Sequence, residues 1–512
     1  MKTSGTLREK SYVYLVASGL MTITLMVIAV FGIVILNGLP NFWPKKLHSF
    51  EMKDGQAYLG EIHGREKIFE ETEYRIRIKI GNREVTGLDF AWLDEEDIVN
   101  QEKAGDAYLL ERLEWGNAYG FVPAMHDDDL QGNLEVAARQ RKEIQSYEKK
   151  YLVKLTEQIA KTRHKLREED SEELRDKLEE LQTQYREGEA ELEELRQKAS
   201  EAVFTLVLAD GREMQIPMIG VLHAHRVNSL SFWEKLRLFG VRFWEFIFTN
   251  PRESNTEGGV FPALYGTVLM VFLMSIVVFP FGVIAAIFLH EYAKRGILLK
   301  LVNITIYNLA GVPSIVYGVF GLGFFIYAVG GWMDQTFFSS YLPSPTLGTG
   351  GILWASMTLA VLTLPVVVVA SLEGLQAVPE IYREGSYALG ATKWEVIKDV
   401  VIPNAMPGML TGLILAVSRA AGEVAPLMLT GVVKSAPSLP LDQVAPFLHL
   451  ERKFMHLGFH IYDVGFQSPN VEAARPMVFN TTLLLLIVVF ALNLVAIIIR
   501  NKLRKKFLRS GV

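Results

Sequence analysis

Six long apolar stretches constrain this chain more than any other feature. They lie at residues 13–36, 261–289, 301–329, 350–372, 405–433 and 477–499. A helix needs about 20 predominantly apolar residues to cross the hydrocarbon core of a bilayer, and each stretch is long enough. The sequence therefore predicts a mainly helical membrane protein with six transmembrane helices.

The charged residues indicate that a large polar block separates the apolar ones. They make up 21% of the chain, although 50% of it is hydrophobic. A single soluble fold explains this mixture less well than a membrane domain that carries a separate polar domain. The formal net charge of −5 gives no reason to expect a nucleic-acid partner. The chain has no cysteine, which excludes disulfides, thiolate nucleophiles and cysteine metal sites.

The first apolar stretch has some features of a signal peptide, because Lys2, Arg8 and Lys10 precede it. A secretory apolar region is usually about 7–15 residues long and ends at small residues. This stretch is longer, and bulky Phe42 and Trp43 follow it. We expect a retained transmembrane helix and not a cleaved signal.

Lysine and arginine residues in the short connections predict the orientation. They gather in the N-terminal tail, after the second and fourth stretches, and in the tail after the sixth. The connection 330–349 has only Asp334 as a charge. With six spans all basic segments fall on one side of the membrane. We therefore expect both termini to be cytoplasmic, and segment 37–260 and the loops near 330–349 and 434–476 to lie outside.

The outer segment contains two candidate β-hairpins. Residues 74–80 alternate between polar and apolar, and a turn at Gly81-Asn82 leads into residues 83–90. Residues 202–219 repeat the pattern around an Asp-Gly turn at 210–211. We expect the two hairpins to pair into one small sheet.

Residues 134–199, between these hairpins, predict a coiled coil. They are about half charged, contain no proline, and carry apolar residues at helical spacing, with Gly188 as the only glycine. Ser171, followed by two glutamates, is typical of a helix start. We expect a two-helix hairpin about 50 Å long at 1.5 Å per residue. One continuous helix of about 100 Å is the alternative.

Two further features of the outer regions leave alternatives open. Residues 229–250 mix aromatic and basic side chains, which suits either a helix at the membrane surface or one packed on the outer sheet. His223 and His225 would face one side of a strand, and His456 and His460 are four residues apart. Either pair has the donors for zinc. We expect solvated surface histidines and no metal site.

The stretch 383–403 carries the most specific motif. It resembles the loop by which permeases of ABC importers dock their ATPase, whose pattern is Glu-Ala-Ala, three residues, Gly, nine residues, Ile, any residue, Leu-Pro. Glu384, Gly390 and Pro403 match at the right spacing, and Gly385 and Ser386 replace the two alanines. An ordinary amphipathic connection is the alternative.

The resemblance implies an ATPase-docking surface, formed by Glu384, Gly385, Ser386, Ala388, Gly390 and Pro403. The chain contains no GxxxxGK[ST] phosphate loop. We therefore expect no cofactor on this chain, with ATP and magnesium bound by a separate ATPase.

A second motif places Arg419 and Glu423 inside the fifth apolar stretch. A charge in a membrane helix is costly and by default suggests a functional site. Residues four apart share a helical face and can pair, and a guanidinium matches phosphate or sulfate oxygens. The stretch resembles the Arg-Ala-x-Gly-Glu-Thr-Ala-Pro segment of phosphate-importer permeases, with Val424 in place of threonine. A purely structural ion pair is the alternative.

Residues 266–267, 289–293 and 310–318 also resemble segments of phosphate-importer permeases, and the likeness extends over 258–500 and the first span. It implies the type I ABC-importer permease fold and a substrate path that includes Arg419, Glu423 and Ser314. It implies no catalytic residue. The expected partners are a second permease subunit, an ATPase dimer and an extracytoplasmic phosphate-binding protein, at a bacterial cytoplasmic membrane.

The expected domains are residues 1–44 with the first span, an extracytoplasmic domain at 45–250, a permease core at 251–503 and a basic tail at 504–512. The outer domain departs from the compact family pattern, and we expect it to guide the binding protein. Two rival functions remain. One is import of another oxyanion, such as sulfate or molybdate. The other is a membrane scaffold or sensor built on a transport fold.

Overall fold

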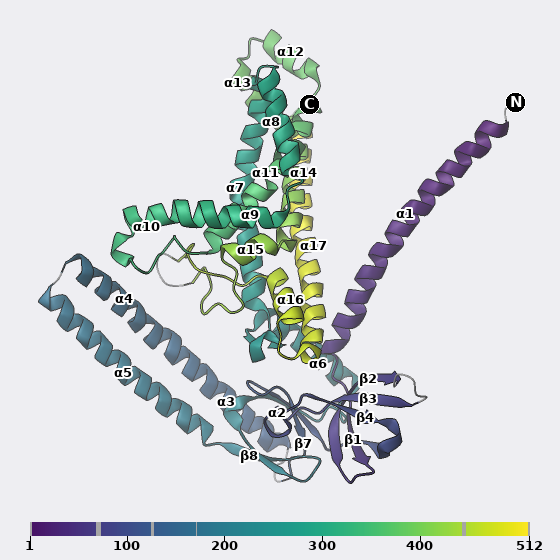
Figure 1. The fold of residues 1–512 in the computed structure, drawn as a ribbon, viewed down its shortest axis with the longest axis vertical. Helices are drawn as coiled ribbons and strands as arrows, with labels where there is room; N and C mark the ends of the chain where they lie inside the picture. The colour runs from purple at the N-terminus through teal and green to yellow at the C-terminus, as the bar shows by residue number, and fades with distance from the viewer. Residues whose placement is uncertain (1–2, 68–72, 124–126, 170, 443–446, 510–512) are drawn as a thin grey trace. The chain divides into compact units, whose positions relative to one another are not determined.

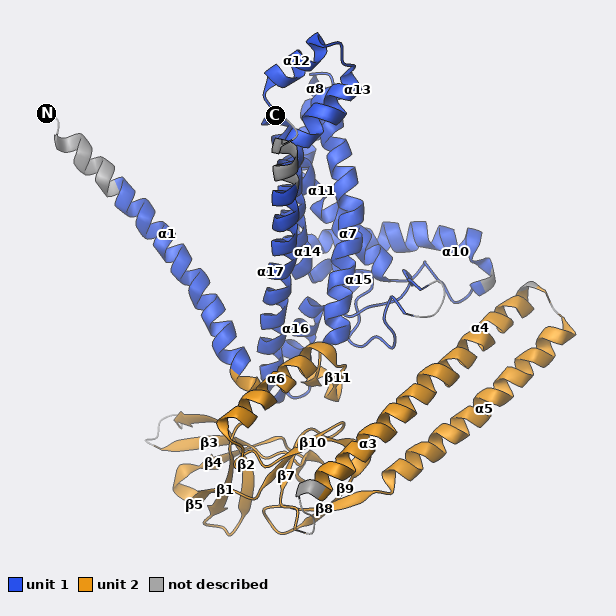
Figure 2. Ribbon diagram, turned by 180° about the vertical axis from the view of Figure 1, so that it is seen from behind, with its two compact units in different colours: residues 1–39, 260–512 blue, residues 40–259 orange. Residues whose placement is uncertain are grey.

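The computed structural model describes residues 3–67, 73–123, 127–169, 171–442 and 447–509. The chain forms two compact units (Figure 2). The first consists of Met1–Leu39 and Val260–Val512, and the second of Pro40–Gly259. The first unit is helical, and the second contains all the named β-strands of the described residues.

In the described part of the first unit, six helices are long and apolar enough to cross a membrane. This confirms the predicted number of spans. The helices that make up these spans are α1 (Thr3–Gly38), α7 (Phe261–Ile287) with η6 (Phe288–Tyr292), α9 (Ser314–Phe320) with η7 (Gly321–Gly330) and α10 (Gly331–Phe337), α11 (Ile352–Gln376), α13 (Lys393–Glu395) with η9 (Val396–Val401) and α14 (Ile402–Gly422), and α17 (Val471–Arg509).

The bounds of the third and fifth spans differ from the prediction. The apolar run 301–329 is broken: α8 (Ile297–Leu309) ends early, and the spanning helix begins at Ser314, directly after Pro313. Proline lacks an N–H and disfavours helix in the residue before it, so it suits a helix start. The fifth span runs from Lys393 to Gly422, not from 405 to 433. A separate helix, α15 (Ala425–Thr430), follows it. Figure 1 shows the run from α9 to α10 crossing the direction of α7, α11 and α17.

Small residues let α7, α11 and α14 approach closely. A Cβ added to Gly408 would lie 2.6 Å from Gly374 Cα, so α11 and α14 almost touch through their backbones. A Cβ on Gly282 would lie 2.6 Å from Val367 Cγ1, so the backbone of α7 packs directly against a side chain of α11. Around these contacts lies a buried core that includes Met270, Met274, Leu359, Ala416 and Ala420.

The second unit is built on two larger antiparallel sheets and a hairpin. The five-stranded sheet has the order β4-β3-β2-β1-β5 and the three-stranded sheet the order β10-β6-β7. Their strands are β1 (Leu47–Met52), β2 (Ala57–Lys67), β3 (Tyr74–Lys79), β4 (Phe90–Asp94), β5 (Ile98–Lys103), β6 (Tyr108–Arg112), β7 (Ala118–Gly120) and β10 (Val221–His225). The hairpin joins β8 (Val203–Val207) to β9 (Glu213–Pro217).

The hairpin predicted at 202–219 is confirmed, with Gly211 at a φ of 82° in its turn. In the other hairpin the return strand begins at Phe90 and not at residue 83. Gly81 and Asn82 both adopt left-handed φ values, and the short helix α2 (Arg83–Thr86) follows them. The expected single sheet is wrong, because β3 and β4 belong to the five-stranded sheet, whereas β8 and β9 form a separate two-stranded sheet.

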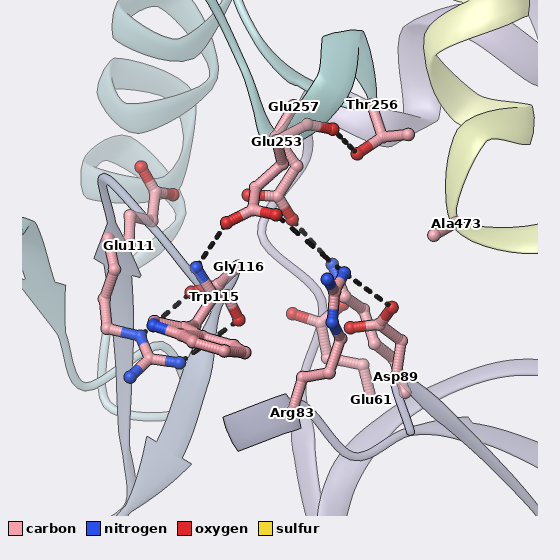
Figure 3. Close-up of polar contacts among 12 residues, drawn as sticks. Glu61, Arg83, Asp89, Glu111, Trp115, Gly116, Glu253, Thr256, Glu257 and Ala473 are labelled. Carbon is pink, nitrogen blue, oxygen red and sulfur yellow. Dashed lines mark hydrogen bonds and ion pairs between the residues drawn. The ribbon is translucent and has the colours of Figure 1, made fainter. Parts of the chain in front are cut away.

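The segment that leaves the second unit is fixed to its strands by a polar network (Figure 3). The carboxylate of Glu253 accepts a hydrogen bond from the Trp115 N–H and lies 3.8 Å from Arg83, which also lies 3.8 Å from Asp89. Glu253 and its next two residues have φ values of 45°, 53° and 73°. Such left-handed residues are unfavourable outside glycine, and the network compensates for them.

A pair of long helices projects from the strands of the second unit. One arm comprises α3 (Asp127–Tyr147), η3 (Glu148–Leu152) and α4 (Val153–Glu168), and the other is α5 (Glu172–Ser200), whose N-cap is Ser171 as predicted. The Tyr147 hydroxyl donates to Glu191 at 2.6 Å, and a Cβ on Gly188 would lie 2.8 Å from Tyr151. The chain therefore turns back on itself. That the pair is a coiled coil remains a prediction.

The helical pair can be tested by cross-linking, because the chain contains no cysteine of its own. We expect a short bifunctional methanethiosulfonate reagent, which attaches to each cysteine through a reducible disulfide, to link the double variant Tyr147→Cys/Glu191→Cys, since the ends of the two native side chains are hydrogen-bonded. Electrophoresis with and without reductant, after cleavage of the chain between the two positions, detects the link.

The matched control is Tyr147→Cys/Glu180→Cys, in which the second cysteine is shifted by about 16 Å along the helix at 1.5 Å per residue. It should not cross-link. Equal yields from both pairs, or no link in the first, would contradict the register. In one continuous helix, positions 147 and 191 would be about 66 Å apart.

Candidate functional site

The segment between α11 and α14 begins with an exposed helix, α12 (Glu380–Ala388). A Cβ on Gly385 would meet no atom within 4 Å, so this part of its surface is open. Of the predicted docking residues, Glu384, Gly385, Ala388 and Gly390 are exposed, whereas Ser386 is half-buried. Large exposed hydrophobic side chains surround them, namely Ile381, Tyr382, Tyr387, Leu389 and Trp394. A short exposed helix of this composition is suited to bury its surface against another protein.

A sharp turn follows α12 at Gly390, whose φ of 88° lies in the left-handed region that glycine adopts readily. The next helix, α13 (Lys393–Glu395), is capped by Thr392 and Glu395 in a capping box. It continues through η9 into α14, where Pro403 occupies the first turn. Pro403 is therefore part of the spanning helix and does not mark the end of a loop.

Arg383 is the buried residue of α12, and its guanidinium joins three parts of the first unit. It donates to the carbonyl oxygens of Leu375 at 3.1 Å and Val378 at 2.8 Å, around the C-terminal end of α11. It also lies 3.2 Å from the carboxylate of Glu291, in η6 at the end of α7. The last carbonyls of a helix lack partners within it, and a cation there is favourable. The guanidinium thus fastens α12 to the ends of two spanning helices.

Lys393 makes a second link to the same place. Its ammonium group donates to the backbone carbonyl of Glu291 and lies 4.4 Å from the centre of the Tyr292 ring. Such a cation–π contact is favourable by about 0.5–1 kcal/mol when exposed. The helices on either side of Gly390 are therefore both attached to η6. These contacts predict that α12, α13 and the ends of α7 and α11 move together.

In the sequence, the basic residues of this segment served only to predict the orientation of the chain in the membrane. These contacts of Arg383 and Lys393 were not predicted. The sequence does contain a signal that Arg383 faces the protein. Positions 383 and 385 lie about 200° apart around a helix of 3.6 residues per turn. A basic residue opposite the small residues of an exposed helix has to face the protein. Its partner Glu291 lies 92 positions away and gives no local signal.

Arg419 and Glu423 of the second motif form the ion pair that their spacing predicts, but they do not both lie on one helix. Arg419 Nε lies 3.3 Å from Glu423 Oε1, and the two side chains are 34% and 21% exposed. The helix α14 ends at Gly422, and Glu423 is extended with a ψ of 134°. Glu423 thus lies just beyond the helix that carries Arg419. A short break and then α15, with a proline in its first turn, follow it.

Ser314 is the first residue of α9 and is half-buried. Its helix packs directly on α15: a Cβ on Gly318 would lie 2.7 Å from Pro426 Cα. The structure thus places the segment around Ser314 next to the one that follows Glu423. On the same helix as Arg419, the hydroxyl of Ser418 donates to Asn493 of α17 at 2.7 Å.

The expectation of solvated histidines is wrong for His456 and His460. Their side chains are buried in the first unit, with 0% and 2% exposure. Burial lowers the pKa of His456 to about 3 and that of His460 to about 4, so both are neutral. His456 accepts a hydrogen bond from the N–H of Gly458 at 3.1 Å and caps α16 (Leu457–Phe466). These histidines are structural groups of the buried interior.

His223 and His225 lie on one strand, β10, as expected, and their rings stack at 5.9 Å. Donor atoms of Glu111, His223 and Glu245 lie within 4.8 Å of one another, a spacing that could hold a metal ion. Two ion pairs already account for this cluster. His223 lies 2.8 Å from Glu245, whose hydrogen bond raises the pKa of His223, and Arg242 lies 2.6 Å from Glu111. The adjacent guanidinium disfavours a cation here.

The sequence matches a known family and individual relatives. Residues 278–509 match the family described as "Binding-protein-dependent transport system inner membrane component". The phosphate transport system permease protein PstA 1 of Mycobacterium tuberculosis (strain CDC 1551 / Oshkosh) is 35% identical over 244 residues, which cover 48% of this chain and 71% of that protein. The phosphate transport system permease protein PstC of Mesorhizobium japonicum is 31% identical over 227 residues, which cover 42% and 66%.

Among solved structures, the MetNI methionine ABC transporter in an inward facing conformation is similar over 47% of this chain and 94% of that chain, with 18% identity and a TM-score of 0.34. The family assignment rests on the sequence matches. The chain belongs to the family of binding-protein-dependent transport system inner membrane components. It is a permease subunit of an ABC importer, and therefore a transport component and not an enzyme.

The contacts of Arg383 predict that Arg383→Met loosens α12. The change removes two hydrogen bonds to carbonyls and leaves the Glu291 carboxylate, whose side chain is 10% exposed, without this cation. Breaking a buried ion pair costs about 3–5 kcal/mol. We expect the amides of 380–389 to exchange with deuterium at least about tenfold faster, since each 1.4 kcal/mol is a factor of ten.

The matched control is Lys398→Met, which removes an exposed cation from the same segment. Mass spectrometry of peptides from both variants should show a change in 380–389 only for Arg383→Met. Unchanged exchange in that variant would show that Arg383 does not hold α12.

Proposed function

We propose that this chain forms one half of the membrane channel of an ATP-driven importer of inorganic phosphate. The observation that carries the proposal is the ion pair of Arg419 and Glu423 at the end of the apolar helix α14. The relatives named as phosphate transport system permeases support phosphate as the cargo. Ala425-Pro426, which follows this pair, matches the Ala-Pro of the phosphate-importer segment that this stretch resembles, and so supports phosphate over sulfate and molybdate.

Arg419 would offset the loss of water around the anion. A guanidinium presents a planar fork of N–H donors that fits two oxygens of a phosphate. Glu423 contacts the Nε of Arg419 at 3.3 Å and so holds the side chain in one orientation. Both side chains are partly exposed, which leaves the guanidinium open to a ligand. Ser314, at the start of the neighbouring helix α9, is the third residue that we place on the path.

ATP would act through the docking segment. In this proposal the ATPase binds Glu384, Gly385, Ser386 and Ala388 of α12 and the turn at Gly390 that follows it. Arg383 and Lys393 then transmit its closure to α7 through Glu291, and Arg383 transmits it to α11 through the carbonyls at the end of that helix. ATP binding favours one of two states of the permease, so that the anion site opens on alternate sides. ATP and magnesium are bound by the partner and not by this chain.

The proposed assembly contains this chain, a second permease subunit of the type I class, an ATPase dimer and an extracytoplasmic phosphate-binding protein. We place it in a bacterial cytoplasmic membrane, with both termini and α12 on the cytoplasmic side. The unit Pro40–Gly259 then lies outside, where it guides the binding protein, and its helical pair acts as a coiled coil.

The proposal predicts that Arg419→Ala strongly lowers uptake. Vesicles that hold the assembled transporter, with ATP on the ATPase side and the binding protein on the other, should take up labelled phosphate. We expect Arg419→Ala to lower uptake at least about tenfold, because an anion interaction with a charged donor contributes about 1.5–3 kcal/mol. Arg419→Lys keeps the charge but not the fork and should be intermediate. Arg475→Ala, which removes an exposed arginine from α17, is the control.

Excess sulfate and molybdate distinguish the rival cargoes. Uptake of labelled phosphate that persists with both competitors present supports phosphate as the cargo. If either competitor blocks uptake, the cargo is another oxyanion, and the proposed ATP-driven import is retained. If assembled wild-type vesicles take up no oxyanion, the scaffold or sensor function gains support. If Arg419→Ala transports as well as Arg475→Ala, the ion pair is only structural.

A further inference from the structure

The helix α6 (Phe232–Phe248) of the second unit has one face packed within that unit. The ring of Phe42 lies 5.4 Å from those of Phe243 and Phe246, and Arg242 is paired with Glu111. Packing on the outer sheet, one of the two alternatives for residues 229–250, is therefore correct for this face, since Glu111 lies on strand β6. It accounts for only one side of the helix.

The opposite face of α6 is apolar and exposed. Trp233 is 74% exposed, Trp244 59% and Phe248 57%. Val241, exposed by 39%, completes the set. At about 100° per residue these four side chains lie within an arc of about 80°. Arg237 is the one charged residue inside this arc. We call these five residues the tryptophan face.

We propose that the tryptophan face lies in the headgroup layer of the membrane, so that α6 seats the second unit on the lipid surface. Only a short length of chain connects α6 to a membrane span. The helix α1 ends at Gly38, and four residues later Phe42 is buried against α6. Four residues span at most about 14 Å of chain. The packed face of α6 is thus attached close to the end of a membrane span.

The side chains of the tryptophan face also suit the headgroup layer. Tryptophan has an apolar body and an N–H donor, and it is enriched where the hydrocarbon core meets water. Arg237, between the aromatic residues, can bind lipid phosphate groups. The two acidic residues of the helix are engaged elsewhere: Glu234 closes the capping box with Ser231, and Glu245 pairs with His223. The exposed face therefore presents aromatic rings and a positive charge without an acidic group.

This inference goes beyond phosphate transport and does not depend on the cargo. A lipid-seated α6 would hold the strands of the second unit at a fixed height above the bilayer. The helical pair and the polar network around Glu253 would then keep a constant distance from the membrane. Lipid is the occupant that we propose, and water or another protein surface are the outcomes that would exclude it.

The absence of native cysteine allows a direct test with spin labels. Single variants Trp233→Cys and Trp244→Cys are labelled with a nitroxide, and the assembled transporter is placed in vesicles of phosphatidylcholine and phosphatidylglycerol. Power-saturation electron paramagnetic resonance compares collisions with oxygen, which is enriched in lipid, and with a water-soluble nickel chelate. Glu193→Cys, at an exposed position of α5, is the aqueous control.

We expect collisions with nickel at both positions to fall at least about twofold below the Glu193→Cys value, while collisions with oxygen rise. Nickel access equal to that control would place the face in water. Low access for both reagents would mean that protein covers it. Either result overturns the proposal. Val241→Cys and Phe248→Cys repeat the measurement on the same face, in case the loss of a tryptophan disturbs the helix.

Discussion

The guanidinium of Arg383 is the contact on which the coupling geometry of the membrane unit depends. An arginine side chain that is 7% exposed must have partners, because a buried charge without them is very costly. Here the partners are two carbonyls at the end of α11 and the carboxylate at the end of α7. The hydrogen bonds and the ion pair on the buried side of α12 therefore determine its position. Its outer surface is left free to carry exposed hydrophobic residues for a partner.

From this contact the spanning helices form a continuous path to the second charged pair. After the turn at Gly390, α13 passes through η9 into α14 without a break, and α14 carries Arg419 near its other end. A helix of 21 residues is about 30 Å long. The backbones of α11 and α14 approach at Gly374 and Gly408, so a shift at one end cannot be absorbed by flexible side chains between them. The same helix thus connects the proposed ATPase surface with the proposed anion site.

The number of spans could be predicted from the sequence, because a helix that crosses the hydrocarbon core must be long and apolar. This requirement is strong and applies within each segment by itself. It misplaced the third and fifth spans, where breaks at Pro313 and Glu423 interrupt apolar runs without changing their hydropathy. It found both motifs, because their spacing lies within one segment. Three features depend on contacts between distant segments, and no local pattern encodes them. They are the ion pair of Arg383 with Glu291, the strands that pair with β3, and the burial of His456.

The most direct test of coupling is whether α12 and the end of α7 move as one body. Nitroxides at Tyr382→Cys and Phe288→Cys, both exposed positions, can be placed in the assembled transporter with an ATPase freed of cysteines. Double electron–electron resonance then gives the distance between the two labels with and without ATP. A distance that stays the same in both states is what the Arg383–Glu291 contact predicts. A distance that shifts, or a distribution that splits in two, when ATP binds would show that α12 moves independently and would contradict the account.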